Sequence, residues 1–468
     1  MPSLISKFFS TRHMVKPDML RGEIPGSREA YSNLTRIALP AVAEMVFAAL
    51  IGMADTIMVG QLGPQAVAAV GLTNQPRFLF LCLFFAFNTG VTAIISRRKG
   101  EGERGEARQC LRMAILLALA LSAVMTALAL AFNEPVMLLA GAKADTIDMS
   151  KDYFFILCTG LVLSTMSMLI CAAQRGIGNT RVTMAVGITA NVFNVLFNFL
   201  LIEGRFGFPR LEVRGAAIAG LIGFFAGFMF ALFSVLKKDA YLRISLSDSW
   251  RPHIATLKNI LRVSWGAVVE QAVLRVGFFS FARVVADLGT LAFAAHQIAM
   301  QLMNLSFTFA EGIAAATTSL VGQNLGKKRP DLSIMYVHIG QRIALMVSAV
   351  LMILSFAGRN FFPTLFVDDA ATIHMAAGVI VILGFIQPVQ TSSVIMSGSL
   401  RGAGDTRFVA FTMLLTVAIM RPCISLFFVY GLGLGLPGAW YAIIIDMSVR
   451  LVILIARFLR GKWIGIRV

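Results

Sequence analysis

The stretch that decides the fold runs from Thr35 to Gly63 and reads TRIALPAVAEMVFAALIGMADTIMVGQLG. Its apolar core, Ile37 to Val59, is long enough to cross a hydrocarbon layer of about 30 Å as a helix. Two carboxylates, Glu44 and Asp55, interrupt this core. Their spacing of eleven residues brings a helix back to nearly the same direction, so both acids lie on one stripe. We therefore predict a membrane-spanning helix with a single polar stripe.

Both carboxylates have a structural and a functional interpretation. A charged side chain at membrane depth is costly, so it is retained where it is paired or used. Glu44 could neutralise an arginine or hydrogen-bond a neighbouring helix, and Asp55 could be a polar residue at the membrane interface. The apolar run continues past Asp55 to Val59, which favours a functional acid at that position.

A second copy of this stretch follows later in the chain. Residues 261–289 read LRVSWGAVVEQAVLRVGFFSFARVVADLG, and Glu44 is matched without a gap by Glu270 (270 − 44 = 226). The same offset persists through loops, because QRGIGNTR at 174–181 is matched by LRGAGDTR at 400–407. A constant offset through loops and helices alike indicates an internal duplication.

The composition is that of a membrane protein with many spans. Of 468 residues, 57% are hydrophobic and only 14% are charged, unlike a soluble protein of this length. The fold class expected is an all-α polytopic membrane protein with twelve transmembrane helices in two pseudo-symmetric six-helix lobes, related by an axis along the membrane normal. The predicted spans are 35–59, 66–96, 108–132, 152–173, 182–203, 215–236, 258–286, 291–321, 333–357, 373–397, 408–430 and 438–460.

The domain organisation follows from these spans and from the basic loops. Lysine and arginine gather in alternate loops, which predicts that both termini are cytoplasmic. The net charge of +17 is then a topology signal that also attracts anionic lipid, rather than a nucleic-acid surface. The expected segments are a cytoplasmic N-terminal tail at 1–34, an N-lobe at 35–236, a cytoplasmic linker at 237–257, a C-lobe at 258–460 and a C-terminal tail at 461–468.

The N-terminal tail and the cysteines carry little functional signal. The first thirty residues are basic and contain no apolar core long enough for a signal peptide. This tail is expected either to lie on the membrane surface or to be disordered. The five cysteines are scattered, and their spacing matches neither a metal site nor a disulfide framework.

The two halves differ at their polar positions. Asn191, Asn194 and Asn198 share one face of the fifth span, while the matching positions of the second half are apolar and Asp55 is matched by Phe281. Amides both donate and accept hydrogen bonds, so they can orient a carboxylate in either protonation state. A polar staple between helices is the structural alternative.

Several motifs together resemble those of the multidrug and toxic compound extrusion (MATE) family. They are LPAVAE at 39–44, DTIMVGQLG at 55–63, AAHQIA at 294–299, TTSLVGQNLG at 317–326 and LRGAGDTR at 400–407. The resemblance covers nearly the whole chain from Thr35, in both halves, and is to a bacterial-type member between the NorM-like and DinF-like branches. It implies two six-helix lobes around an outward-facing cleft, and export of amphipathic, often cationic, compounds in exchange for H⁺ or Na⁺.

The resemblance also implies site residues. The first-span coupling aspartate of the family carries over to Asp55, whereas Asn198 stands where some members have a second acid. Acids of the seventh and tenth spans in NorM-like members fall on Leu274 and Gln390, so the resemblance implies no sodium site in the C-lobe. The candidate cation-coupling residues are Asp55, Asn194, Asn198 and Glu44, and the candidate substrate-cleft residues are Asn191, Glu270, Glu311, Gln301 and Gln390.

The leading interpretation is a secondary active multidrug efflux antiporter of the plasma (inner) membrane. We expect small organic substrates, H⁺ rather than Na⁺ as the coupling ion, contact with membrane lipids, a monomer, and no cofactor, metal or nucleic-acid partner. The alternative is a lipid or lipid-linked oligosaccharide flippase of the same superfamily, with a more basic cleft. An intramembrane enzyme is not expected, because HExxH, GxSxG at a helix start and a paired aspartate motif are absent, and no Walker A sequence indicates primary ATP drive. Arg421-Pro422 in the eleventh span is interpreted as a structural kink.

Overall fold

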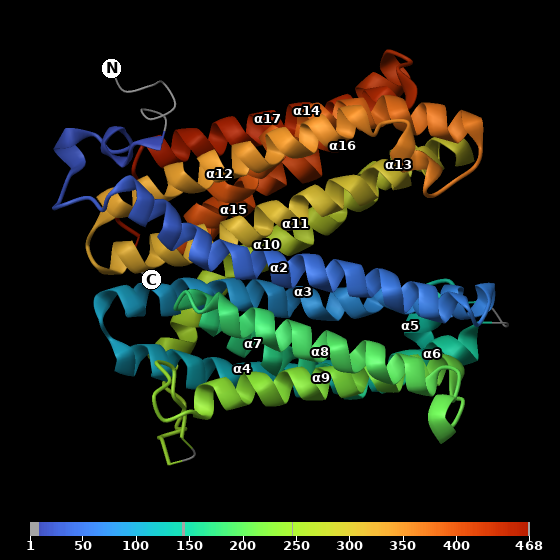
Figure 1. Ribbon diagram of the computed structural model, residues 1–468, viewed down its shortest axis with the longest axis horizontal. Helices are drawn as coiled ribbons and strands as arrows, with labels where there is room; N and C mark the ends of the chain where they lie inside the picture. Colours follow the sequence, from blue (N-terminus) through green and yellow to red (C-terminus); the bar gives the residue numbers. More distant parts are fainter. Residues whose placement is uncertain (1–8, 143–145, 246, 467–468) are drawn as a thin grey trace. The chain divides into compact units, whose positions relative to one another are not determined.

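A computed structural model describes residues 9–142, 146–245 and 247–466. Within these residues every regular element is a helix and no strand occurs (Figure 1). This confirms the expected all-α class. The chain divides into two compact units, one formed by Met1–Val42 with Trp265–Val468 and the other by Ala43–Ser264. Helix α2 (Ser27–Gly60) carries the chain from the first unit into the second.

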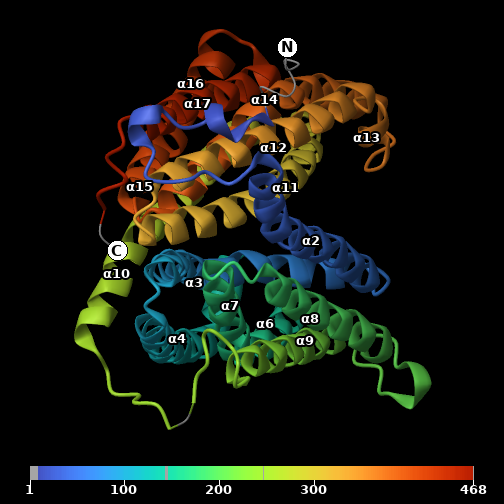
Figure 2. The same cartoon turned by 60° about the vertical axis from the view of Figure 1, so that its left-hand side comes forward.

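The unit of Ala43–Ser264 is built on closely packed helices. Its α8 and α9 lie along each other (Figures 1 and 2), and a Cβ added at Gly223 of α9 would lie 2.7 Å from the carbonyl oxygen of Ala190 in α8. Glycine permits this approach between helix backbones. Besides the second part of α2, the unit contains α3 (Pro64–Glu101), α4 (Arg104–Ala131), α5 (Asn133–Leu139), α6 (Ile147–Thr159), α7 (Leu161–Gly176), α8 (Thr180–Leu201), the short η3 (Arg205–Gly207) and α9 (Glu212–Leu236).

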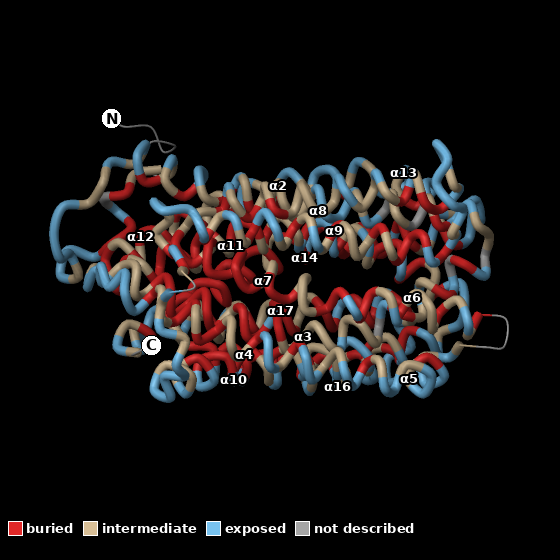
Figure 3. The backbone as a smooth tube through the Cα atoms, turned by 90° about the horizontal axis from the view of Figure 1, so that it is seen from below, coloured by how far each residue is buried: buried red, intermediate tan, exposed pale blue. Residues whose placement is uncertain are grey.

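The other unit has α14 at its centre. Helix α14 packs on α11, α12 and α17, and buried positions follow it along much of its length (Figure 3). After the first part of α2, the unit contains most of α10 (Ile254–Ala286), then α11 (Thr290–Gly326), α12 (Pro330–Ala357), α13 (Phe361–Thr364), α14 (Ala370–Gly402), α15 (Thr406–Met413), the π-helical η4 (Leu414–Met420), α16 (Arg421–Leu426), the π-helical η5 (Phe427–Gly431) and α17 (Gly435–Leu459).

Each of the twelve predicted spans coincides with a helix or a helical run. Eight helices in the described residues are long and apolar enough to cross a membrane, and the pair α6–α7, bent by 48°, makes a ninth. Helices α10, α11 and α17 coincide with three further predicted spans and contain 33, 37 and 25 residues. The duplication recurs in the helix starts: α3 and α11 begin at 64 and 290, α4 and α12 at 104 and 330, and α8 and α15 at 180 and 406, each pair 226 apart.

The described part of the N-terminal tail is folded, so the expectation of a disordered tail is wrong for residues 9–26, while a position on the membrane surface stays a prediction. Residues 9–26 contain the short helices η1 (Thr11–His13) and η2 (Pro17–Met19). Met14 and Val15 are buried in an apolar cluster with Tyr336 of α12. The apolar residues spaced between the basic ones therefore find a packing partner within the protein. Residues 1–8 lie outside the described part.

Candidate functional site

Asp55 of α2 is held by two amides of α8. The Asn198 side-chain nitrogen donates to Asp55 Oδ1 at 2.7 Å, and Asn198 is only 2% exposed. In the amide orientation that satisfies its hydrogen bonds, Asn194 donates to Asp55 Oδ1 at 2.8 Å and to Oδ2 at 3.0 Å, and accepts from the backbone N–H of Gly220 at 3.2 Å. The structure thus brings together three of the four candidate coupling residues.

Glycines of α9 determine where Asn194 points. In this orientation, a Cβ added at Gly220 would lie 3.8 Å from the side-chain oxygen of Asn194, and a Cβ added at Gly223 would lie 3.1 Å from Asn194 Cβ. Because these positions lack side chains, α9 approaches α8 closely and supports the amide from behind. The amide is left with its donors directed at Asp55, an arrangement in which a supporting layer fixes a functional side chain.

The surroundings of Asp55 are polar without providing an ion pair. Among the described residues, no lysine or arginine forms an ion pair with its carboxylate, although the charge of Arg77 on α3 acts on it at longer range. The Arg77 guanidinium lies over the ring of Phe224, 5.2 Å from its centroid. The Asn198 side-chain oxygen is buried without a hydrogen-bond partner. This oxygen is an acceptor close to the carboxylate, so it is suited to accept a hydrogen bond from Asp55 when that carboxyl group is protonated.

Glu44 contacts the same helix, but it is paired with a cation. Thr183 Oγ1 of α8 donates to Glu44 Oε2 at 2.6 Å, and Arg175 lies 3.5 Å from Oε1. Both acids of α2 therefore face α8, which confirms the single polar stripe predicted from their spacing. The contact with Arg175 corresponds to the structural interpretation of Glu44, whereas Asp55 has amide partners instead.

In the unit of residues 265–468, Arg401 of α14 lies between two candidate acids. Its guanidinium is 3.7 Å from Glu270 of α10 and 3.6 Å from Glu311 of α11. Glu270 is 3% exposed, and its Oε2 has no hydrogen-bond partner. Gln390 is buried and donates to the Met303 carbonyl at 3.5 Å. The remaining candidates do not join either group: Gln301 is exposed, and Asn191 makes no described hydrogen bond to Asp55.

Sequence reasoning missed the arginine partners and one buried acid. Arg175 and Arg401 lie in the repeated QRGIGNTR and LRGAGDTR motifs, where the sequence indicates only basic loops. Asp446 and Arg450, inside the last predicted span, were not singled out. An acid and a base four residues apart in an apolar run are a detectable signal, because such charges face the bundle interior and pair with each other.

Together, the apolar helices and the buried polar sites define an integral membrane protein of the transporter class. The MatE family model matches the chain twice, over residues 40–200 and 267–427, which together are well over half of the chain. The chain therefore belongs to the MATE family, whose members are transporters and not enzymes. The double match also agrees with the internal duplication.

Similar proteins share nearly the full length of the chain. The probable multidrug resistance protein NorM of Thermotoga maritima is 29% identical over 442 residues, covering 94% of each chain. The multidrug resistance protein PmpM of Pseudomonas aeruginosa is 28% identical, covering 93% of this chain and 92% of its own. An outward-facing multidrug resistance MATE transporter superposes with a TM-score of 0.86 at 23% identity, covering 95% of this chain and 98% of that one. This last likeness shows the shared fold.

Proposed function

We propose that the chain is a secondary active multidrug efflux antiporter. It exports organic, often cationic amphipathic, compounds by alternating access, and the return of H⁺ through Asp55 drives the export. The named relatives are multidrug resistance proteins, which supports efflux of organic solutes over lipid flipping. The basic loops support an orientation with both termini in the cytoplasm of a bacterial inner membrane.

The observation that carries the coupling proposal is the kind of partner each acid has. In the part of the chain that the structure describes, the carboxylates of Glu44, Glu270, Glu311 and Asp446 each form an ion pair with an arginine. Asp55 instead receives hydrogen bonds from amides. A guanidinium holds a carboxylate as an anion, because a proton would leave the buried arginine without a partner. Amides support both protonation states, so Asp55 can exchange a proton.

The energetic requirement for coupling is modest. Neutralising a carboxylate in an apolar surrounding changes its free energy by several kcal/mol. Reversing a population from 1:99 to 99:1 requires about 5.5 kcal/mol. A proton on Asp55 can therefore shift the balance between two conformations. Sodium is the alternative ion, since the oxygens of Asp55 and its amide neighbours are hard ligands of the kind that bind such cations.

The test is Asp55→Asn in inverted membrane vesicles, with uptake of a fluorescent organic cation as the readout. Proton and sodium gradients are imposed separately. The asparagine mimics the protonated acid, so we expect normal expression and loss of gradient-driven uptake. Glu44→Gln serves as the matched control, because it changes the other acid of the same stripe and is expected to retain uptake. Wild-type uptake by Asp55→Asn under a proton gradient would refute the assignment of Asp55 as the coupling residue. Uptake by the wild-type protein under a sodium gradient alone would identify Na⁺, in place of H⁺, as the coupling ion.

A further inference from the structure

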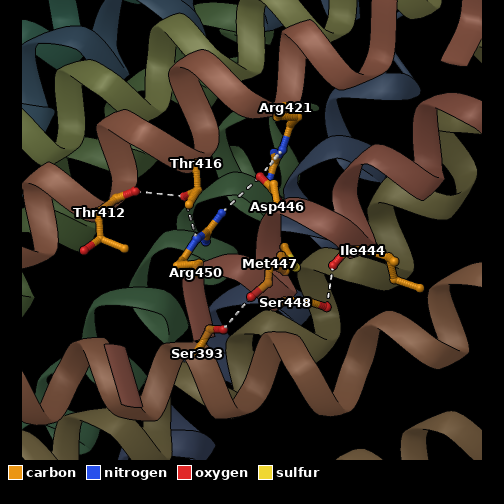
Figure 4. Close-up of polar contacts among 9 residues, drawn as sticks. All are labelled: Ser393, Thr412, Thr416, Arg421, Ile444, Asp446, Met447, Ser448 and Arg450. Atoms are coloured by element: carbon orange, nitrogen blue, oxygen red, sulfur yellow. Dashed lines mark hydrogen bonds and ion pairs between the residues drawn. The ribbon is translucent and has the colours of Figure 1, made fainter. Parts of the chain in front are cut away.

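The coupling proposal leaves unused a second group of charges, buried within the unit of residues 265–468. Asp446, at the middle of α17, is 0% exposed. Arg421 donates to its Oδ2 at 2.8 Å and to its Oδ1 at 3.3 Å. Arg450, one turn further along α17, donates to Oδ2 at 3.3 Å and to Thr416 Oγ1 at 3.2 Å (Figure 4). Two arginines thus share one buried carboxylate.

These three side chains carry one positive charge too many for a buried site. A buried charge without a counter-charge costs several kcal/mol. Glu270 of α10 is 3.7 Å from Arg401. It makes no ion pair with Arg450, but the two charges act on each other at longer range, so Glu270 supplies the counter-charge. Arg401 is in turn shared with Glu311. The result is an alternating series of three arginines and three carboxylates with no net charge: Glu311, Arg401, Glu270, Arg450, Asp446 and Arg421.

One end of the series holds the eleventh span at its irregular point. Arg421 lies between the π-helical segments η4 and η5, and its guanidinium is stacked over Phe278 of α10 at 5.4 Å from the ring centroid. Thr416, the second acceptor of Arg450, belongs to η4. The triad of Arg421, Asp446 and Arg450 therefore ties η4 and α16 to α17 and α10. Segments of π-helix within a longer helix are frequent at functional sites.

We propose that these six side chains act as one charge-balanced network, in which the charge on Glu270 sets how firmly Arg421, Asp446 and Arg450 hold the eleventh span. Removing this charge, as Glu270→Gln does, leaves one excess positive charge among the three arginines. Their mutual repulsion then weakens the contacts of Arg450 with Asp446 and Thr416, and releases η4 from α17. The charged groups that act on Glu270 are Arg401 from α14, Glu311 from α11 and Arg450 from α17. The role of this network in transport presupposes the proposed antiport.

The test compares charge removal with charge rebalancing. Glu270→Gln leaves an excess of one positive charge, Arg450→Gln leaves an excess of one negative charge, and the double variant is neutral. We expect each single variant to lower the yield of folded protein and drug export at least tenfold, and the double variant to recover both to within about threefold of wild type. Glu270→Gln with Arg407→Gln is the matched control, since Arg407 is exposed; this pair removes one negative and one positive charge without rebalancing the network.

A second measurement reports on the eleventh span without requiring transport. Cys423, two residues after Arg421, is exposed, whereas Cys110, Cys158 and Cys171 are buried. In purified protein with Cys82→Ala, we expect Glu270→Gln to change the rate of Cys423 alkylation at least fivefold, and the double variant to restore it. The network proposal would be overturned if the losses of folded yield and export in the two single variants multiplied in the double variant. It would also be overturned if Glu270→Gln left the rate of Cys423 alkylation unchanged. The Asp55→Asn transport assay tests the antiport proposal alone. A failure of that proposal can therefore be told apart from a failure of the network.

Discussion

Substitution of Asn198 by alanine gives the sharpest test of how the amides act on Asp55. The change removes a donor 2.7 Å from the carboxylate, while the two contacts from Asn194 remain. A hydrogen bond to a charged group contributes about 1.5–3 kcal/mol. Its loss makes the anion less favourable relative to the neutral acid. At about 1.36 kcal/mol per pH unit, the pH midpoint of transport should rise by about one to two units.

The assay is proton-driven uptake into proteoliposomes over a range of pH, with each preparation checked for thermal stability. Asn191→Ala is the matched control, because Asn191 lies on the same helix and makes no described hydrogen bond to Asp55. We expect the control to keep the wild-type midpoint. If both variants gave the same profile, the amide of Asn198 would be a structural staple and not part of the coupling site.

Two further predictions concern packing and capping. A Cβ at Gly277 would lie 2.5 Å from the Val417 carbonyl oxygen of η4, so Gly277→Ala should destabilise the protein by about 1–3 kcal/mol. The control is Gly378→Ala, because a Cβ there would have nothing within 4 Å. This variant should leave the melting temperature in detergent unchanged or slightly raised. Asp369 caps α14 by accepting from the Thr372 backbone N–H at 2.8 Å and from its hydroxyl at 2.6 Å, and these bonds lower the pKa of the Asp369 carboxyl. A lowered folded-state pKa stabilises the protein above the unfolded value of about 3.9, and this stabilisation declines as the pH falls below that value. Asp369→Ala should therefore lower the melting temperature most at neutral pH and progressively less as the pH is lowered below about 3.9; an equal loss at every pH would contradict the cap.

The elements that follow from local patterns were predictable from the sequence. The apolar runs gave all twelve spans, because their length is set by the bilayer. The spacing of Glu44 and Asp55 predicted one shared face, and α8 contacts both residues through Thr183 and Asn198. Helical periodicity was sufficient here, because one helix face packs mainly against one neighbour.

The pairing of charges was not predictable, because it depends on which helices pack together. Arg401 contacts Glu270 and Glu311, residues 131 and 90 positions away in the sequence (401 − 270 and 401 − 311). The folded tail was missed for a related reason. Met14 and Val15 have no amphipathic period of their own, and they are buried only because the cluster around Tyr336 is present. Such contacts belong to the tertiary structure and have no local signal.

The interior acids have different partners, and we infer that they have different roles in transport. A carboxylate bonded to arginine is costly to neutralise, since the proton would strand a buried guanidinium. Such pairs keep a constant charge, and they fix helix positions as Arg421 and Asp446 do between α16 and α17. Asp55 receives amide hydrogen bonds, and amides stabilise its two protonation states more evenly. Antiport requires one carboxylate whose charge changes within a bundle that otherwise stays electrically constant. The amide partners of Asp55 therefore mark it as that carboxylate more clearly than its position in an apolar helix does.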